Sequence, residues 1–233
     1  MRRSYDALVT GLHDSTHSDG DEEYAMALVV NLPKQDKPHR NDVLVAAGQA
    51  VVATVLDPQA ADNPEFARWY GKRIRKITRR ARNIAWERVQ DVPGVTVTHG
   101  TASVRAFVPA PVHATDPRVD KLQIGGTDLP FDEYQGSSQG ICGVFIDTSL
   151  KMSLGKATAQ VGHATMLFVA SRPYSEVEAW ATAGFPLTVR EVSHEEFIAE
   201  ASRADAVVVH DAGFTEVAPG SATVVAVPRG ADT

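Results

Sequence analysis

Short apolar segments rich in β-branched residues alternate with helical segments along most of this chain. The strand-like segments are YAMALVVNL (24–32), VTVTHGTASVRAFVPAP (95–111, one or two strands), GVFID (143–147), PLTVREV (186–192), DAVVV (205–209) and ATVVAVP (222–228). Helices are predicted over residues 42–56, 64–91, 156–171, 173–182 and 193–204. In the last of these, Ser193 and Glu196 have the spacing of a capping box. The alternation predicts an α/β protein whose ligands bind at the carboxyl ends of strands.

The second half of the chain repeats the order of segments of the first half. We expect an acidic polar tail (1–23), an N-terminal α/β domain (24–111), a junction rich in Pro, Gly, Ser and Asp (112–140) and a second α/β domain (141–233). GQAVVATVL (48–56) parallels GHATMLFVA (162–170), and GTASVRAFVP (100–109) parallels GSATVVAVP (220–228). These echoes favour a degenerate repeat. The alternative is that apolar helices and strands of this composition resemble one another by chance.

In the repeat interpretation, the first half lacks the polar residues of the second half. Gln49 stands where the second half has His163, and Asp42 stands where it has Lys156. Nothing in the first half corresponds to Asp211.

The composition is that of a globular protein with a hydrophobic core, since 43% of the 233 residues are hydrophobic and 22% are charged. The single cysteine, Cys142, excludes an intrachain disulfide and fits a reducing compartment. The N-terminal segment lacks the apolar core of a signal peptide, and no apolar run in the chain is long enough for a bilayer span. We therefore expect a cytoplasmic protein without a membrane partner.

Positive charge is concentrated between Arg68 and Arg88, where nine basic residues stand with one acidic residue, Glu87. That window carries +8 in a chain of net charge −6, so the remaining residues carry −14. Residues 66–85 fit an amphipathic helix whose basic face consists of Arg68, Lys72, Arg75, Lys76, Arg79 and Arg82. A row of guanidinium groups suits the phosphate backbone of a nucleic acid. The alternatives are a solvated helix face and a helix that lies on a membrane surface.

A second set of polar residues accompanies the apolar segment LKMSLGKATAQVGHATML (150–167). Its members are Lys151 and Gly155 in a loop, Lys156, Gln160 and His163 along one edge of the helix that follows, and Asp211 and Thr215 in the turn after residues 205–209. If the two preceding strands run the same way in one sheet, the loop and the turn converge. The group so formed could activate water and bind phosphate or a developing oxyanion.

Each of these residues also has an ordinary structural explanation. A histidine on a buried helix is commonly a hydrogen-bonded core residue, and an aspartate before Ala-Gly is a common turn residue. No spacing of His, Cys and carboxylate residues indicates a metal site, and there is no Gly-x-Ser-x-Gly motif of a serine hydrolase.

Two segments of the second half resemble the signature motifs of the type-2 peptidyl-tRNA hydrolases. LKMSLGKATAQVGHA is similar to Lys-Met-x-x-Gly-Lys-x-x-Ala-Gln-x-x-His-Ala, and DAGFTEVAPGSATVVAV is similar to Asp-Ala-Gly-x-Thr-x-x-x-Pro-Gly. The resemblance covers about residues 141–230. The chain departs from the family pattern in the pair Ser153-Leu154, in the short segment SRADAVVVHDAG, and in its additional first 110 residues.

The resemblance implies a small three-layer α/β domain with a mixed sheet between helices. It also implies hydrolysis of the ester between a peptide, or an N-blocked aminoacyl group, and the 3′ end of tRNA, without a metal or organic cofactor. The site residues that it implies are Lys151, Lys156, Gln160, His163, Asp211 and Thr215.

Our hypothesis gives each site residue a role. His163 activates water or shuttles a proton, and Asp211 orients it. Lys151 and Lys156 bind phosphate or the oxyanion. Gln160 and Thr215 position other groups in the site.

The expected partner is tRNA, bound by the basic helix of the first half. Dimers are common in the family, so we expect either a monomer in which the fused repeat replaces the second subunit, as an intrachain pseudo-dimer, or a homodimer. Two other functions stay open: a non-catalytic tRNA- or RNA-binding protein that retains the hydrolase fold, and a hydrolase of another ester or amide.

Overall fold

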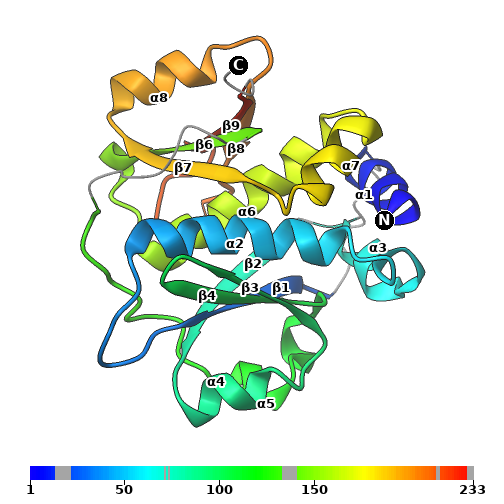
Figure 1. Ribbon diagram of the computed structural model, residues 1–233, viewed down its shortest axis with the longest axis vertical. Helices are drawn as coiled ribbons and strands as arrows, with labels where there is room; N and C mark the ends of the chain where they lie inside the picture. Colours follow the sequence, from blue (N-terminus) through cyan, green and yellow to red (C-terminus); the bar gives the residue numbers. More distant parts are fainter. Residues whose placement is uncertain (14–21, 71, 73, 133–140, 214–215, 230–233) are drawn as a thin grey trace.

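The computed structural model describes residues 1–13, 22–70, 72, 74–132, 141–213 and 216–229. The chain forms two β-sheets with helices between and outside them, which confirms the α/β class (Figure 1). From the bottom to the top of Figure 1, the layers are α4 (Ile84–Val89) with α5 (Pro117–Asp120), the first sheet, α2 (Arg40–Val55) with α6 (Leu154–Ala170), the second sheet, and α8 (His194–Ala201).

Three further helices gather at one end of the molecule (Figure 1): α1 (Arg2–His13), α3 (Pro64–Tyr70) and α7 (Tyr174–Thr182). Single 3₁₀ turns are η1 (Ala60–Asp62), η2 (Val112–Ala114) and η3 (Thr148–Leu150). Within the described ranges, no helix combines the length and the apolar character needed to cross a membrane.

Helix α1 corrects the prediction of a loose tail for the first part of residues 1–23, while residues 14–21 of that tail lie outside the described residues. Leu8 is fully buried, and the Tyr5 hydroxyl donates a hydrogen bond to the Arg172 carbonyl, 2.7 Å away. The rings of Tyr5 and Tyr174 pack edge to face with centroids 5.4 Å apart. The sequence of this polar segment does not reveal these contacts, because they are made with residues far away in the sequence.

The first sheet has the strand order β2-β1-β4-β3, and the second has the order β7-β6-β9-β8. The strands of the first sheet are β1 (Tyr24–Asn31), β2 (Arg75–Ala81), β3 (Gly94–His99) and β4 (Ala102–Phe107), with β5 (Ala110–Pro111) paired to the start of β1. Those of the second sheet are β6 (Cys142–Asp147), β7 (Leu187–Val192), β8 (Val207–His210) and β9 (Ala222–Pro228). Both sheets are mixed, with one parallel pair, β1 with β2 or β6 with β7.

The predicted basic helix over residues 64–91 is wrong beyond Tyr70. Helix α3 ends there, residues 75–81 form β2, and only 84–89 are helical again. Ile74 has φ of 40°, in the left-handed region, which is incompatible with a continuing α-helix. Seven residue pairs join β2 to β1, so sheet pairing overrides the helical spacing of the apolar residues.

The two halves share more than strand order. Val30 of β1 pairs with Arg80 and Val104, as Ile146 of β6 pairs with Glu191 and Val224. Two tryptophans at matching places make the same hydrogen bond: Trp69 Nε1 donates to the Arg75 carbonyl (3.1 Å), and Trp180 Nε1 donates to the Pro186 carbonyl (2.9 Å). Ile74 and Phe185, each just before the strand that follows, both have positive φ.

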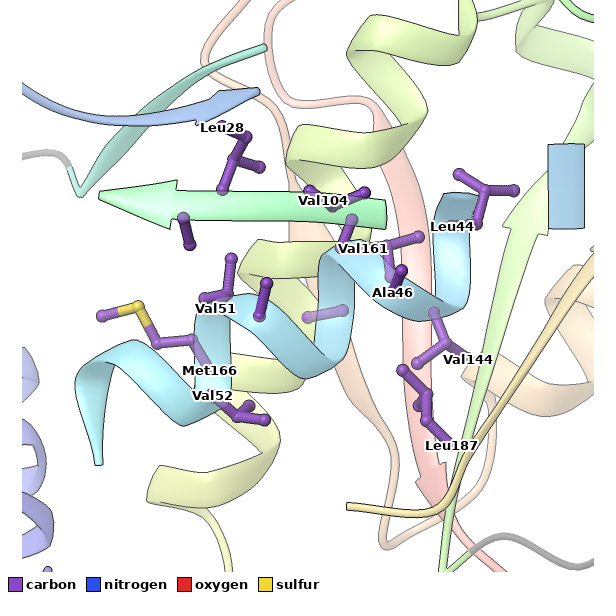
Figure 2. Close-up of a cluster of buried hydrophobic side chains, with 14 of the residues drawn as sticks. Leu28, Leu44, Ala46, Val51, Val52, Val104, Val144, Val161, Met166 and Leu187 are labelled. Atoms are coloured by element: carbon purple, nitrogen blue, oxygen red, sulfur yellow. The ribbon is translucent and has the colours of Figure 1, made fainter. Parts of the chain in front are cut away.

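Helices α2 and α6 cross at two glycines and join the halves in one core. A Cβ on Gly48 would lie 2.5 Å from Leu187 Cδ2 of β7 and 3.0 Å from Thr165 Cγ2 of α6, and a Cβ on Gly162 would lie 2.7 Å from Val51 Cγ2 of α2, so glycine permits the close approach at both places. Figure 2 shows side chains of both sheets packed around these helices, including Leu28 and Val104 of the first sheet and Val144 and Leu187 of the second. The two halves therefore share one large hydrophobic core, and each half has a smaller cluster of its own besides.

Candidate active site

The loop after β6 and the turn after β8 lie at the same edge of the second sheet. Both strands are antiparallel to β9, so β6 and β8 run in the same direction. Helix α6 begins at this edge, where Ser153 Oγ accepts a hydrogen bond from the Lys156 amide (3.2 Å) as an N-cap. The Glu216 carboxylate in turn accepts hydrogen bonds from the Ser153 amide and hydroxyl, each 2.7 Å long, and so ties the turn to the start of the helix.

Three of the predicted site residues meet at this edge. The Asp211 Oδ2 atom lies 2.5 Å from Lys156 Nζ and 2.6 Å from Gln160 Nε2. The other carboxylate oxygen accepts a hydrogen bond from the Gly213 amide (2.8 Å). The side chains of Lys156 and Asp211 are only 11% and 8% exposed. Because a charged pair at such low exposure is costly to displace, these hydrogen bonds fix the geometry of the carboxylate.

Thr223 supports this cluster from β9. Its hydroxyl donates to Gln160 Oε1 (2.8 Å), which orients the amide so that its nitrogen faces Asp211. Thr223 is fully buried and is the polar residue of an otherwise apolar strand, ATVVAVP. That contrast is the one signal in the sequence that could have identified it.

Lys151 and Thr215 have different places. Lys151 follows η3 with φ of 50°, is exposed, and lines a cavity of about 750 Å³ together with Met152, Ser153 and Glu216. Thr215 lies outside the described residues. Lys151 therefore lines a cavity beside the start of α6 and, among the described residues, is not part of the hydrogen-bonded cluster.

His163 faces the first half of the chain instead of Asp211. Among the described residues, Asp211 is bonded to Lys156, Gln160 and the Gly213 amide, not to His163. Burial lowers the pKa of His163 well below its usual value of 6.5, and the positive charge of Lys76 on β2 lowers it further. The imidazole is therefore neutral at physiological pH, and the expected orientation of His163 by Asp211 is not found.

Lys76 is partly buried opposite His163. Its ammonium group donates to the Ile74 carbonyl (3.3 Å) and lies 4.9 Å from the centroid of the Trp69 ring. Met166 Sδ is 3.7 Å away. These groups do not replace the water that the ammonium loses, so burial lowers the pKa of Lys76 from 10.5 to about 7.

Replacing Lys76 with methionine is expected to stabilise the fold most at low pH. The unfolded chain holds this proton up to about pH 10.5 and the folded chain only up to about pH 7, so the cost of the charge is complete below pH 7 and declines above it. We expect Lys76→Met to raise the free energy of unfolding by about 2–4 kcal/mol at pH 6, and by less than half as much at pH 9. Urea titrations at both pH values measure this, with Lys121→Met at an exposed position as the control. An equal gain at both pH values would contradict the explanation by charge.

The six basic residues predicted to bind nucleic acid do not share one face. Arg68 pairs with Glu65 (2.6 Å) and Arg75 with Glu23 (2.7 Å), while the Lys72 ammonium donates to the Glu22 carbonyl. The other three basic residues differ in their surroundings. Lys76 faces His163, Arg79 is buried and pairs with Asp120 (2.9 Å), and Arg82 is exposed. In a strand, successive side chains point to opposite faces, which separates residues that a helix would have brought together.

No metal site is evident in the described ranges, because no three His, Cys, Asp or Glu residues there lie close enough to hold an ion. The chemistry of the cluster is that of one buried carboxylate, one ammonium group and one oriented amide. Such a set can accept a proton from water and stabilise negative charge on a reacting oxygen.

The second sheet and all the residues of this cluster lie in one stretch of the chain, and a family model matches that stretch. The model of the family described as peptidyl-tRNA hydrolase PTH2 matches residues 142–232, from the start of β6 to beyond the end of β9. The first 141 residues lie outside the matched region. The resemblance of the two motifs is thereby confirmed: the C-terminal half of this chain matches the peptidyl-tRNA hydrolase PTH2 family.

Proposed function

We propose that this protein hydrolyses the ester between a peptide, or an N-blocked aminoacyl group, and the 3′ end of tRNA, without a metal ion. The observation that carries the proposal is the buried Lys156–Asp211–Gln160 cluster, which lies inside the region that matches the hydrolase family. Its position at the start of α6 leaves the adjoining cavity beside Lys151 open to a substrate.

In this proposal Asp211 takes the proton of the attacking water. Among the described residues its Oδ1 atom accepts one hydrogen bond, from Gly213, which leaves a lone pair for a water molecule. The water oxygen bonds to the ester carbonyl carbon as its proton passes to Asp211, and the Lys156 ammonium stabilises the oxyanion. The bond to the 3′ oxygen then breaks, that oxygen receives the proton, and a carboxylic acid and free tRNA leave.

His163 is a packing residue in this proposal and takes no part in the reaction. It contributes to the packing between the halves, since Lys76 of β2 is its charged neighbour. Gln49 occupies the matching place in α2, where its side chain donates to the Phe185 carbonyl (3.0 Å). His163→Gln therefore introduces in α6 the residue type that α2 has at the matching place.

We also propose that the N-terminal half is a degenerate copy of the catalytic half and takes the place of a partner subunit, so that the chain is a monomer. The identical strand order, the matched tryptophan hydrogen bonds and the mutual glycine contacts of α2 and α6 support this. In the copy, Asp42 stands where the second half has Lys156, and its carboxylate accepts bonds from the amide and hydroxyl of Thr101. These hydrogen bonds join the start of α2 to the turn between β3 and β4. In the second half, the matching turn carries Asp211. With tRNA as substrate, the expected location remains the cytoplasm.

The test is release of labelled N-acetylamino acid from N-acetylaminoacyl-tRNA by the whole chain, with and without a chelator. We expect turnover that survives the chelator, and we expect His163→Gln to keep kcat within about threefold of the original, because general acid–base catalysts contribute about 10²–10⁴-fold. A loss of that larger size in His163→Gln would restore His163 as the base. Retention of deacylated tRNA with no turnover at any enzyme concentration would instead identify a non-catalytic tRNA-binding protein.

A further inference from the structure

We propose that the segment joining the two halves, residues 122–132, builds the binding surface for the single-stranded 3′ end of the tRNA. A terminal base stacks on Phe131 beside the catalytic cluster, and the phosphates of the preceding nucleotides occupy a basic cavity of the first half. This inference rests on the proposed function for the identity of the ligand, but Phe131 and all the residues that line the basic cavity lie outside the region that matches the hydrolase family.

The first part of the surface is the cavity of about 750 Å³ beside the N-cap of α6, the helix that carries Lys156 and Gln160. It is lined by Phe131 and Leu129 of the joining segment and by Lys151, Met152, Ser153 and Glu216 from the catalytic half. Ser153 caps the helix that carries Lys156, one turn away. The volume is in the range of sites that hold a small molecule or a nucleotide, and its apolar side comes from the joining segment.

Phe131 has the environment of a stacking platform. It is 63% exposed, although a large apolar side chain gains free energy by burial. The Arg40 guanidinium lies 4.4 Å from the centroid of its ring, and that guanidinium is fixed by two hydrogen bonds of 2.8 Å to Glu191. An aromatic ring held in place yet open to solvent can stack a nucleobase of any sequence.

The second part is an adjoining cavity of about 350 Å³ with a strongly basic lining. Asp128 and Leu129 line both cavities, so the two cavities are neighbours on the surface. The basic residues are Lys34 and Lys37 from the loop after β1, Arg80 near the end of β2, and Arg82 just after that strand. Asp128 is the one acidic residue among those that line this cavity, in a chain whose net charge is −6.

The joining segment organises this basic cavity. Arg80 Nε donates to the Gly125 carbonyl (2.9 Å), and the Arg80 amide donates to the Gln123 carbonyl (2.9 Å). Gly126 has φ of +71°, and a Cβ there would lie 3.2 Å from the Arg80 guanidinium, so a glycine permits the close approach. Lys34, Lys37 and Arg82 are exposed and form no ion pair with another described residue. Their charges are therefore available to phosphates.

The arrangement favours an acylated RNA end over a free nucleotide. One cavity supplies a stacking surface next to the cluster that would cut the ester, and the other supplies several positive charges farther from it. A mononucleotide would fill only one of them. A single strand that places its terminal base on Phe131 has further phosphates that can reach the second cavity.

The experiment uses the full chain and two substrates, N-acetylaminoacyl-tRNA and 3′-O-(N-acetylaminoacyl)-adenosine, which has no phosphates. We expect Phe131→Ala to raise KM for both substrates by about 5- to 150-fold, the equivalent of one lost base stack, with kcat within about threefold. Ile124→Ala is the matched control, because Ile124 is 57% exposed in the same segment and lines neither cavity. Phe131→Tyr keeps a ring and should restore KM. A KM for Phe131→Ala equal to that of Ile124→Ala would overturn the stacking site.

The basic cavity is tested by the double substitution Lys34→Ser with Arg82→Ser, against Arg88→Ser with Lys121→Ser as a control of equal charge. We expect KM for the tRNA substrate to rise and the slope of log KM against log salt concentration to fall by about 1–2, with no change for the adenosine substrate. Equal salt slopes in the two double variants would overturn this part.

The affinities of all variants for deacylated tRNA are measured in parallel. They separate a failure of this surface from a failure of the proposed function, because binding does not require turnover. A wild-type chain that binds tRNA without cutting it, and loses that binding in Phe131→Ala, would refute the hydrolase while supporting the surface.

Discussion

Asp211→Asn is expected to lower kcat for N-acetylaminoacyl-tRNA by about 10²–10⁴-fold, the usual contribution of a general base. Asparagine keeps the shape of the side chain but cannot take a proton from water at neutral pH. Its amide nitrogen would also meet donors, because Lys156 and Gln160 both give hydrogen bonds to the carboxylate. KM should change little, since the described contacts of Asp211 are within the protein. Single-turnover rates at saturating enzyme measure the chemical step directly.

Asp205→Asn is the matched control for this prediction. Asp205 precedes the same strand, β8, and is held by Arg203 at 3.0 Å, but it is 41% exposed and lies away from the cluster. Its substitution should leave kcat within about twofold, because an exposed ion pair contributes at most about 1 kcal/mol to stability and has no part in the reaction. A decrease of less than threefold in Asp211→Asn would show that Asp211 is not the base.

Glu191→Ala is expected to reduce the free energy of unfolding by about 3–5 kcal/mol. Glu191 of β7 accepts two hydrogen bonds of 2.8 Å from Arg40, at the start of α2, so this pair joins the two halves. The side chain of Arg40 is only 4% exposed and that of Glu191 only 14%. Without the carboxylate, the guanidinium stays buried with no charge to balance it. Urea unfolding monitored by tryptophan fluorescence measures the loss.

A neighbouring ion pair provides the comparison. Arg190 and Glu196 lie 2.7 Å apart, but their side chains are 37% and 39% exposed, so Glu196→Ala should cost less than about 1 kcal/mol. In the double variant Arg40→Met with Glu191→Ala, most of the lost stability should return, because no buried charge remains. If Glu191→Ala and Glu196→Ala are equally stable, the ion pair does not stabilise the contact between the halves.

The sequence predicts much of the catalytic half correctly, because local patterns and tertiary structure agree there. The strand at 143–147, the helix from about 156 and the N-cap at Ser193 are found within a few residues of their predicted places. Lys156, Gln160 and Asp211 could be identified together, since the direction of two strands determines that the loops following them converge.

The basic segment shows where such prediction fails. Phe66, Tyr70 and Ile74 have helical spacing, but Ile77 belongs to β2, whose partner β1 is about 50 residues earlier in the chain. The local sequence does not show that residues 75–81 pair with β1. The direction of His163 was missed for a related reason: the residue that faces it, Lys76, comes from the other half of the protein.

The shared core around α2 and α6 has a consequence for how this protein can change. In a symmetric assembly of two identical chains, every substitution occurs twice and the assembly comes apart on dilution. Here both sides of the contact belong to one polypeptide, so the contact is independent of protein concentration and each side can be altered alone. One side can therefore keep Lys156 and Asp211 while the other has Asp42 in a closed turn and a basic cavity of its own. An assembly of two identical chains cannot differ in this way, because every residue occurs in both copies.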